Sequence, residues 1–116
     1  MSVALETLLS SAPYLAELAT RHADWFAAAR MTPDAALSGV LAEVAAAGRD
    51  APSEDEIGRV LRSAKGRVAL LAGVSEVEGR WTTAQSTAAL SDLADAALDA
   101  GLTVLIRLAA TPRLVR

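Results

Sequence analysis

The chain has 116 residues and a formal net charge of −3, and 53 % of its residues are hydrophobic but only 3 % aromatic. The absence of cysteine excludes a disulfide framework, a thiolate metal site and a cysteine nucleophile, and no segment has the surplus of basic residues that nucleic-acid binding requires. We expect a single helical domain over residues 1–116, because a core of Ala, Leu and Val favours closely packed helices.

The sequence offers no sign of a membrane span or of export. No uninterrupted apolar stretch reaches the ~20 residues that a spanning helix needs. Residues 1–6 lack the basic start of a signal peptide. We therefore predict a cytoplasmic protein that makes no membrane contact.

The first half of the chain predicts four helices. A short one covers residues 3–10, a second begins with Pro13 in its first turn, and a third covers 22–29. In the fourth, over residues 32–48, Thr32 is the expected cap and apolar residues recur at helical spacing until the closing glycine.

A long fifth helix is predicted within residues 53–79. Ser53 and Glu56 have the spacing of a capping box, in which the Ser hydroxyl and the Glu carboxylate each accept a backbone N–H of the other residue. The stretch 68–74 is apolar all round, as expected of a helix covered on more than one face. Gly79 is suited to the left-handed conformation that ends such a helix.

A sixth helix is predicted within residues 82–110, again with a capping box, formed by Thr82 and Gln85. A short turn before it makes the two long helices antiparallel neighbours. The predicted fold is therefore all-α: a helical bundle with two long antiparallel C-terminal helices and shorter N-terminal helices. The leucines expected to be buried in this pair are Leu71, Leu90, Leu98 and Leu105.

Few residues are candidates for chemistry. His22 is the only histidine and has no cysteine beside it, so we favour a helix-end histidine over a catalytic or metal-binding one. Asp92, Asp95 and Asp99 share one helical face, where carboxylates are neighbours that a hard cation would suit. A solvated polar face is the favoured interpretation, because Mg²⁺ sites usually draw ligands from more than one element.

Two further groups admit two interpretations each. The basic cluster of the fifth helix would form surface salt bridges, or meet a phosphate or an acidic partner; its members are Arg59, Arg62, Lys65 and Arg67. The aromatic side chains Trp25, Phe26 and Trp81 would pack at helix turns, or form a partner-binding patch. We favour the salt bridges and the packing.

Several segments resemble one family. The runs AKGRVALL (64–71), GRW (79–81) and ALSDLADAAL (89–98), with SAPYLAEL (11–18) and RHADW (21–25), are similar to the helical segment that precedes the first nucleotidyltransferase core of bacterial glutamine synthetase adenylyltransferase. That family attaches AMP to glutamine synthetase and removes it. The resemblance covers nearly the whole chain.

The resemblance implies a non-catalytic role. The family's transferase core has a glycine-containing loop followed by paired aspartates that bind metal and nucleotide, and nothing in this chain matches them. We therefore assign no catalytic, cofactor-binding or metal-binding residue, and expect Mg²⁺ and ATP to bind only in a full-length enzyme. The expected partners are the following nucleotidyltransferase domain and glutamine synthetase.

A free-standing helical interaction or dimerisation module is the alternative. In a longer enzyme the following domain would cover the apolar C-terminal helix, so in isolation we expect that helix to drive formation of a homodimer or larger species. The exposed strip would comprise Leu102, Val104, Leu105, Ile106 and Leu108. The same residues folded into their own bundle would instead leave a monomer.

Overall fold

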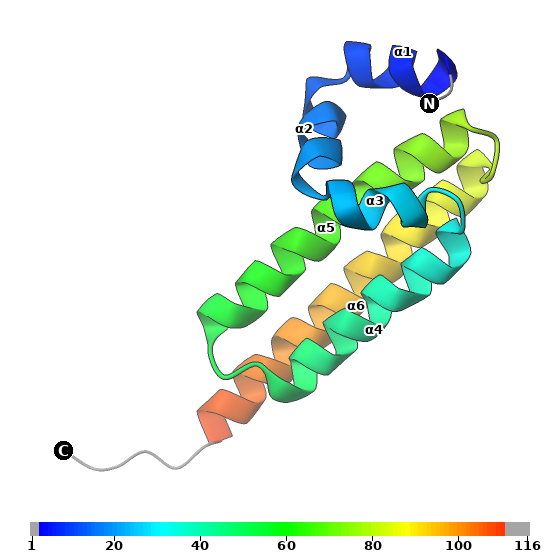
Figure 1. Ribbon diagram of the computed structural model, residues 1–116. Helices are drawn as coiled ribbons and strands as arrows, with labels where there is room; N and C mark the ends of the chain where they lie inside the picture. The colour runs from blue at the N-terminus through cyan, green and yellow to red at the C-terminus, as the bar shows by residue number, and fades with distance from the viewer. Residues whose placement is uncertain (1–2, 111–116) are drawn as a thin grey trace.

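The computed structural model describes residues 3–110, and within this range the chain forms six α-helices and no strand (Figure 1). The predicted all-α fold is confirmed. The two longest helices, of 24 and 28 residues, fall inside the two ranges predicted for them. The helices are α1 Val3–Ser11, α2 Pro13–Arg21, α3 Ala23–Ala29, α4 Pro33–Asp50, α5 Glu54–Val77 and α6 Thr83–Ala110.

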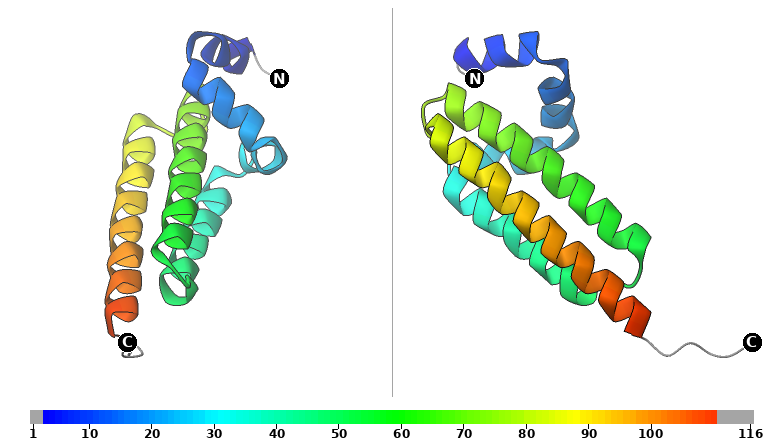
Figure 2. Two further views of the ribbon diagram at one scale, coloured as in Figure 1. Left: turned by 90° about the vertical axis from the view of Figure 1, so that its left-hand side faces the viewer. Right: turned by 180° about the vertical axis from the view of Figure 1, so that it is seen from behind.

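The three long helices α4, α5 and α6 lie side by side and form the main bundle (Figures 1 and 2). α5 runs antiparallel to both of its long neighbours, as predicted for α5 and α6. The short helices α1, α2 and α3 cover the end of α5 that leads into the turn before α6. No helix within residues 3–110 combines the length and the apolar character that crossing a membrane demands.

Local signals set both ends of α5 and the start of α6. Thr82 and Gln85 form the full capping box: the Gln85 N–H donates to Thr82 Oγ1 at 3.1 Å and the Thr82 N–H donates to Gln85 Oε1 at 2.8 Å. At Ser53 only the hydroxyl accepts as predicted, from the Glu56 N–H at 3.1 Å, because the Glu56 carboxylate accepts from Arg59 instead. Gly79 has φ of +76°, the left-handed conformation expected after α5.

One predicted cap is wrong in its detail. Thr32 occupies the N-cap position of α4, but its side chain makes no capping hydrogen bond. Pro33 lies in the first turn of α4 as expected, at a position where a backbone N–H would have no partner inside the helix. α4 also continues two residues beyond the predicted end, to Asp50.

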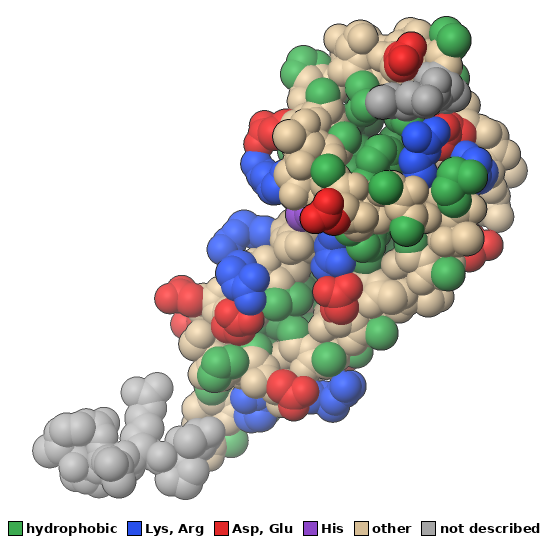
Figure 3. All heavy atoms as spheres, in the orientation of Figure 1, with side chains coloured by type: hydrophobic (Ala, Val, Ile, Leu, Met, Phe, Trp, Pro, Cys, Tyr) green, Lys and Arg blue, Asp and Glu red, His purple; other side chains and the backbone are tan. Residues whose placement is uncertain are grey.

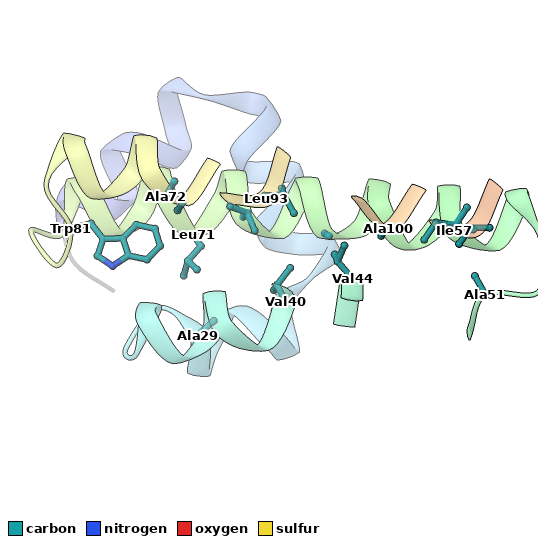
Figure 4. Close-up of a cluster of buried hydrophobic side chains, with 14 residues drawn as sticks. Ala29, Val40, Val44, Ala51, Ile57, Leu71, Ala72, Trp81, Leu93 and Ala100 are labelled. Carbon is teal, nitrogen blue, oxygen red and sulfur yellow. The ribbon is translucent and has the colours of Figure 1, made fainter. Parts of the chain in front are cut away.

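The main core runs between α4, α5 and α6 (Figure 4). Trp81 closes it at the turn between α5 and α6, and Ala51 and Ile57 close it at the opposite end. A second cluster joins α1, α2 and α3 to the other face of α5, through Leu70 and Val74. α5, the helix predicted to be covered on more than one face, is therefore covered on two faces. The helices α4 and α6 cover one face, and the N-terminal helices cover the other.

α4 and α6 approach closely because their contact is made of small residues. A Cβ atom added at Gly48 would lie 3.0 Å from Ala100 Cα, closer than ordinary side chains allow. Beyond this contact, the Arg107 guanidinium of α6 donates to the carbonyl oxygens of Gly48 and Ala51 at 3.2 and 2.8 Å. These bonds satisfy carbonyl groups at the end of α4 that have no partner inside their own helix.

The buried face of α6 differs from the predicted one. Leu71 on α5 is fully buried as expected, but the predictions for Leu90, Leu98 and Leu105 are wrong, since 45 to 65 % of these side chains is exposed. The helices α4 and α5 cover only part of the apolar face of α6. The part that they contact consists mostly of small side chains. The buried residues of α6 are Ser86, Ala89, Leu93, Ala100 and Val104.

Candidate functional site

The outer face of α6 is a row of exposed large apolar side chains. Exposure reaches 65 % at Leu98 and 67 % at Ile106. The row comprises Leu90, Leu98, Leu102, Leu105 and Ile106, and we call it the α6 outer row. The sequence predicted an exposed strip at the C-terminal end of this helix. Of its residues, Leu102, Leu105 and Ile106 are exposed, Leu108 is half-buried, and Val104 is fully buried in the core. Large exposed apolar patches are typical of interaction surfaces.

An apolar groove of about 340 Å³ lies beside the row, between α5 and α6. Its walls come from Leu61 on α5 and from Leu90, Leu93, Ala94 and Ala97 on α6. Two cations of α5, Arg62 and Lys65, also line it. The groove therefore combines an apolar floor with positive charge on its α5 side.

A second hollow, of about 450 Å³, lies on the other side of the same two cations, between α2 and α5. We call it the cationic hollow, because Arg21, Arg59, Arg62 and Lys65 all line it and no carboxylate does. Figure 3 shows Lys and Arg side chains gathered near the single His side chain, where the N-terminal helices meet α5. Arg21 is contributed by α2, so the predicted basic cluster of α5 did not include it.

The predicted basic cluster divides into two kinds of residue. Arg67 is buried and forms two hydrogen bonds with the Glu43 carboxylate, at 2.9 and 3.2 Å, while its guanidinium lies over the Trp25 ring. Arg59 pairs with Glu56. Arg59 therefore forms a surface salt bridge as predicted, whereas the ion pair of Arg67 involves a buried guanidinium. Arg62 and Lys65 form no ion pair with any residue of the range 3–110.

His22 lies at the corner between α2 and α3, as the helix-end interpretation predicts. Its ring faces α5, where a Cβ atom at Gly66 would come within 3.7 Å of Nε2. Partial burial and the positive charges of Arg67 and Arg21 lower the pKa of His22 below its ordinary value. The lowered pKa favours the neutral form of the imidazole, which lines the cationic hollow.

The three aspartates of α6 are exposed, as the solvated-face interpretation predicts. Across the described residues there is no group of three or more His, Cys, Asp or Glu side chains placed to hold a metal ion. Asp92, Asp95 and Asp99 thus stay on a single helical face without a ligand from a second element.

The aromatic side chains pack at helix turns. Trp81 is 5 % exposed and its indole N–H donates to Asp34 Oδ1 at 2.8 Å, which ties the α5–α6 turn to α4. Phe26 is buried among the N-terminal helices, and Trp25 is half-buried against both clusters. They do not form a common exposed patch.

One ionic cluster was missed by the sequence analysis. Glu78, 5 % exposed at the end of α5, pairs with Arg30 after α3 and with Arg80 in the following turn. The partners are 48 and 2 residues away along the chain. Only Arg80 is near enough in sequence for a local pattern to have suggested the pair.

Comparison with known proteins identifies one family. The sequence profile of the family described as glutamate-ammonia ligase adenylyltransferase matches residues 2–113. Relatives described as bifunctional glutamine synthetase adenylyltransferase/adenylyl-removing enzyme are 37 % identical over 75 residues in Bradyrhizobium diazoefficiens and 31 % identical over 111 residues in Rhodopseudomonas palustris strain TIE-1. A further relative, from Bradyrhizobium sp. strain BTAi1, is 34 % identical over 96 residues.

These alignments cover 65, 95 and 82 % of the present chain, but only 8, 11 and 10 % of the relatives. The chain thus spans about a tenth of the length of the curated relatives that it matches. No solved structure matches significantly. Since the profile match covers the whole of the six-helix region, the chain belongs to the glutamate-ammonia ligase adenylyltransferase family.

Proposed function

We propose that this chain is the N-terminal helical part of an enzyme that adenylylates and deadenylylates glutamine synthetase, and that its role is to support the nucleotidyltransferase domain. The relatives carry about nine tenths of their length outside the matched segment. The proposal places catalysis, together with Mg²⁺ and ATP, in that remaining part and assigns no catalytic residue to this chain. It also places the protein in the cytoplasm, in line with its lack of cysteine.

The observation that carries the proposal is the α6 outer row. Its exposed leucines and isoleucine lie between residues 90 and 106 of α6 and border the apolar groove shared with α5. Each large apolar side chain gains roughly 1.5 to 3 kcal/mol on full burial, so a continuous row favours contact with another apolar surface. We propose that the nucleotidyltransferase domain covers this row, and that other exposed faces of the bundle are available to contact glutamine synthetase.

The proposal is tested by one substitution measured in two contexts. Leu98→Glu leaves the isolated chain folded with little loss of stability, because Leu98 is 65 % exposed there. In the intact enzyme that carries this segment, the same substitution places a charge in a buried contact, and we expect a clearly lower midpoint of thermal unfolding. Thr103→Glu, at an exposed position of α6 outside the outer row, is the matched control.

Equal, small effects of Leu98→Glu in both contexts contradict the proposal. The coding sequence downstream of Arg116 is an independent check: a glycine loop followed by paired aspartates supports it. A stop codon there favours the alternative, a free-standing interaction module that buries the α6 outer row by self-association.

The proposal also makes a negative prediction about nucleotide binding. We expect calorimetric titration of the chain with Mg·ATP to give no saturable heat at micromolar concentrations, since nothing in the chain matches the glycine-containing loop and paired aspartates of the family's transferase core. Saturable micromolar binding contradicts the assignment of nucleotide chemistry to the remaining domains.

A further inference from the structure

We propose that the cationic hollow between α2 and α5 binds a compact, metal-free anion that carries phosphate groups, with Arg62 and Lys65 as its main contacts. The inference does not depend on the proposed function. It is carried by the charges, the shape and the donor groups of a single site.

The first argument is charge. Four cationic side chains, Arg21, Arg59, Arg62 and Lys65, line one hollow, and no carboxylate lines it. Glu17 and Glu56 pair with Arg21 and Arg59, whereas Arg62 and Lys65 have no ion-pair partner within residues 3–110. Neighbouring like charges repel one another, and a bound anion converts that repulsion into attraction.

The second argument is donor chemistry. Arginine presents a planar fork that matches two phosphate oxygens, and lysine adds a compact point charge. Arg62 and Lys65 are one helical turn apart on α5, so both are able to reach one ligand. The half-buried Ser63 and the exposed Tyr14 add hydroxyl donors from α5 and α2.

The third argument concerns the type of ligand. A volume of about 450 Å³ suits a small molecule. An extended nucleic acid needs a track of cations, but the whole chain has a net charge of −3 and six acids balance the six bases between residues 49 and 80. Since no carboxylate lines the hollow to share a metal ion, the ligand binds without Mg²⁺. This is compatible with the absence of Mg·ATP binding expected above.

The test uses the 116-residue chain and sodium pyrophosphate as the probe. Two-dimensional ¹H–¹⁵N NMR at low ionic strength should show saturable shifts concentrated at the amides of residues 21–22 and 62–66. The double variant Arg62→Gln/Lys65→Gln should bind at least about tenfold more weakly, since it loses two charge-assisted contacts. Both residues are exposed, so the variant should fold normally, as circular dichroism would verify.

Arg49→Gln is the matched control, because Arg49 is an exposed cation at the end of α4, outside the hollow. It should retain wild-type affinity, and an excess of Mg²⁺ over pyrophosphate should weaken binding to the wild type. The inference is overturned by shifts spread over the whole surface, or by an equal loss in Arg49→Gln. It is also overturned if a hexaglutamate peptide binds more tightly than pyrophosphate, which would assign the hollow to an acidic protein segment.

Discussion

α5 and α6 are the two longest helices, and α6 is the more apolar of the two, yet α6 is the less buried. α5 lies between two clusters, with Val68 and Leu71 in the main core and Leu70 and Val74 in the cluster of N-terminal helices. α6 has neighbours on one side only, and its buried face is made largely of small side chains. Its large apolar side chains, with the exception of Leu93 and Val104, are partly or mainly exposed.

The difference shows that apolar spacing identifies a helix more reliably than it identifies the buried face. The apolar stripe of α6 is wide enough for two contacts, and small residues such as Gly48 on α4 and Ala100 decide which part of it meets the neighbouring helices. The remaining leucines then lie on the outside. The predictions below test this contrast, starting from the largest expected effect.

Paired leucine substitutions test the contrast directly. Leu71→Ala on α5 removes a fully buried side chain and should lower the free energy of unfolding by about 2 to 5 kcal/mol. Leu98→Ala on α6 makes the same chemical change at an exposed position. At protein concentrations low enough to keep the chain monomeric, it should stay within about 0.5 kcal/mol of wild type. Urea denaturation followed by circular dichroism measures both. Similar losses for the two variants would show that α6 is covered on its outer face.

The contact between α4 and α6 gives the next largest effect. Gly48→Val places a branched side chain where even a Cβ atom would lie 3.0 Å from the α6 backbone. Since backbone atoms cannot move aside easily, we expect the free energy of unfolding to fall by about 1 to 3 kcal/mol. Gly39→Val is the control, because a Cβ atom there meets nothing within 4 Å. If both variants lose the same stability, helix propensity and not the close contact would be responsible.

Much of the fold was predictable because its signals are local. The Thr82–Gln85 capping box, the turn at Gly79 and the apolar run over residues 68–74 each depend on neighbours in the sequence, and each is present in the structure. The family resemblance was likewise predictable, and the profile match confirms it.

The candidate sites were predictable only in part, since they depend on residues far apart in the chain. The cationic hollow requires Arg21 of α2 to lie beside Arg62 and Lys65 of α5, and no local spacing links these positions. The pairing of Arg67 with Glu43 likewise joins residues 24 positions apart and removes Arg67 from the predicted basic cluster. The exposure of Leu98 follows from the small residues that bring α4 and α6 together.

Association tests the outer side of α6. We expect the wild-type chain to form a homodimer or larger species at moderate concentration, because self-association removes the α6 outer row from water. Ile106→Glu, at a position that is 67 % exposed, should weaken this association at least about tenfold without unfolding the chain. Sedimentation velocity over a range of concentrations measures both. A wild type that remains monomeric would contradict the prediction, and a dimer unaffected by the substitution would place the contact elsewhere.

The smallest expected effect concerns His22, where the N-terminal helices meet α5. Partial burial and the charges of Arg67 and Arg21 lower the pKa of His22 below 6.5 in the folded chain, whereas the unfolded chain titrates near that value. The folded state thus binds fewer protons than the unfolded state. The contribution of His22 to the free energy of unfolding is therefore fully present above its pKa in the unfolded chain. It is lost as the pH falls through its pKa in the folded chain.

We therefore expect the wild type to lose slightly more stability than His22→Gln between pH 7.5 and pH 5. Urea denaturation of both proteins at the two pH values isolates this contribution, because the carboxylates titrate alike in each. The imidazole ¹H signals should titrate with a pKa below 6.5. A pKa above 6.5 would mean that a carboxylate, and not the neighbouring arginines, dominates the surroundings of His22. In that case the sign of the stability difference would be reversed.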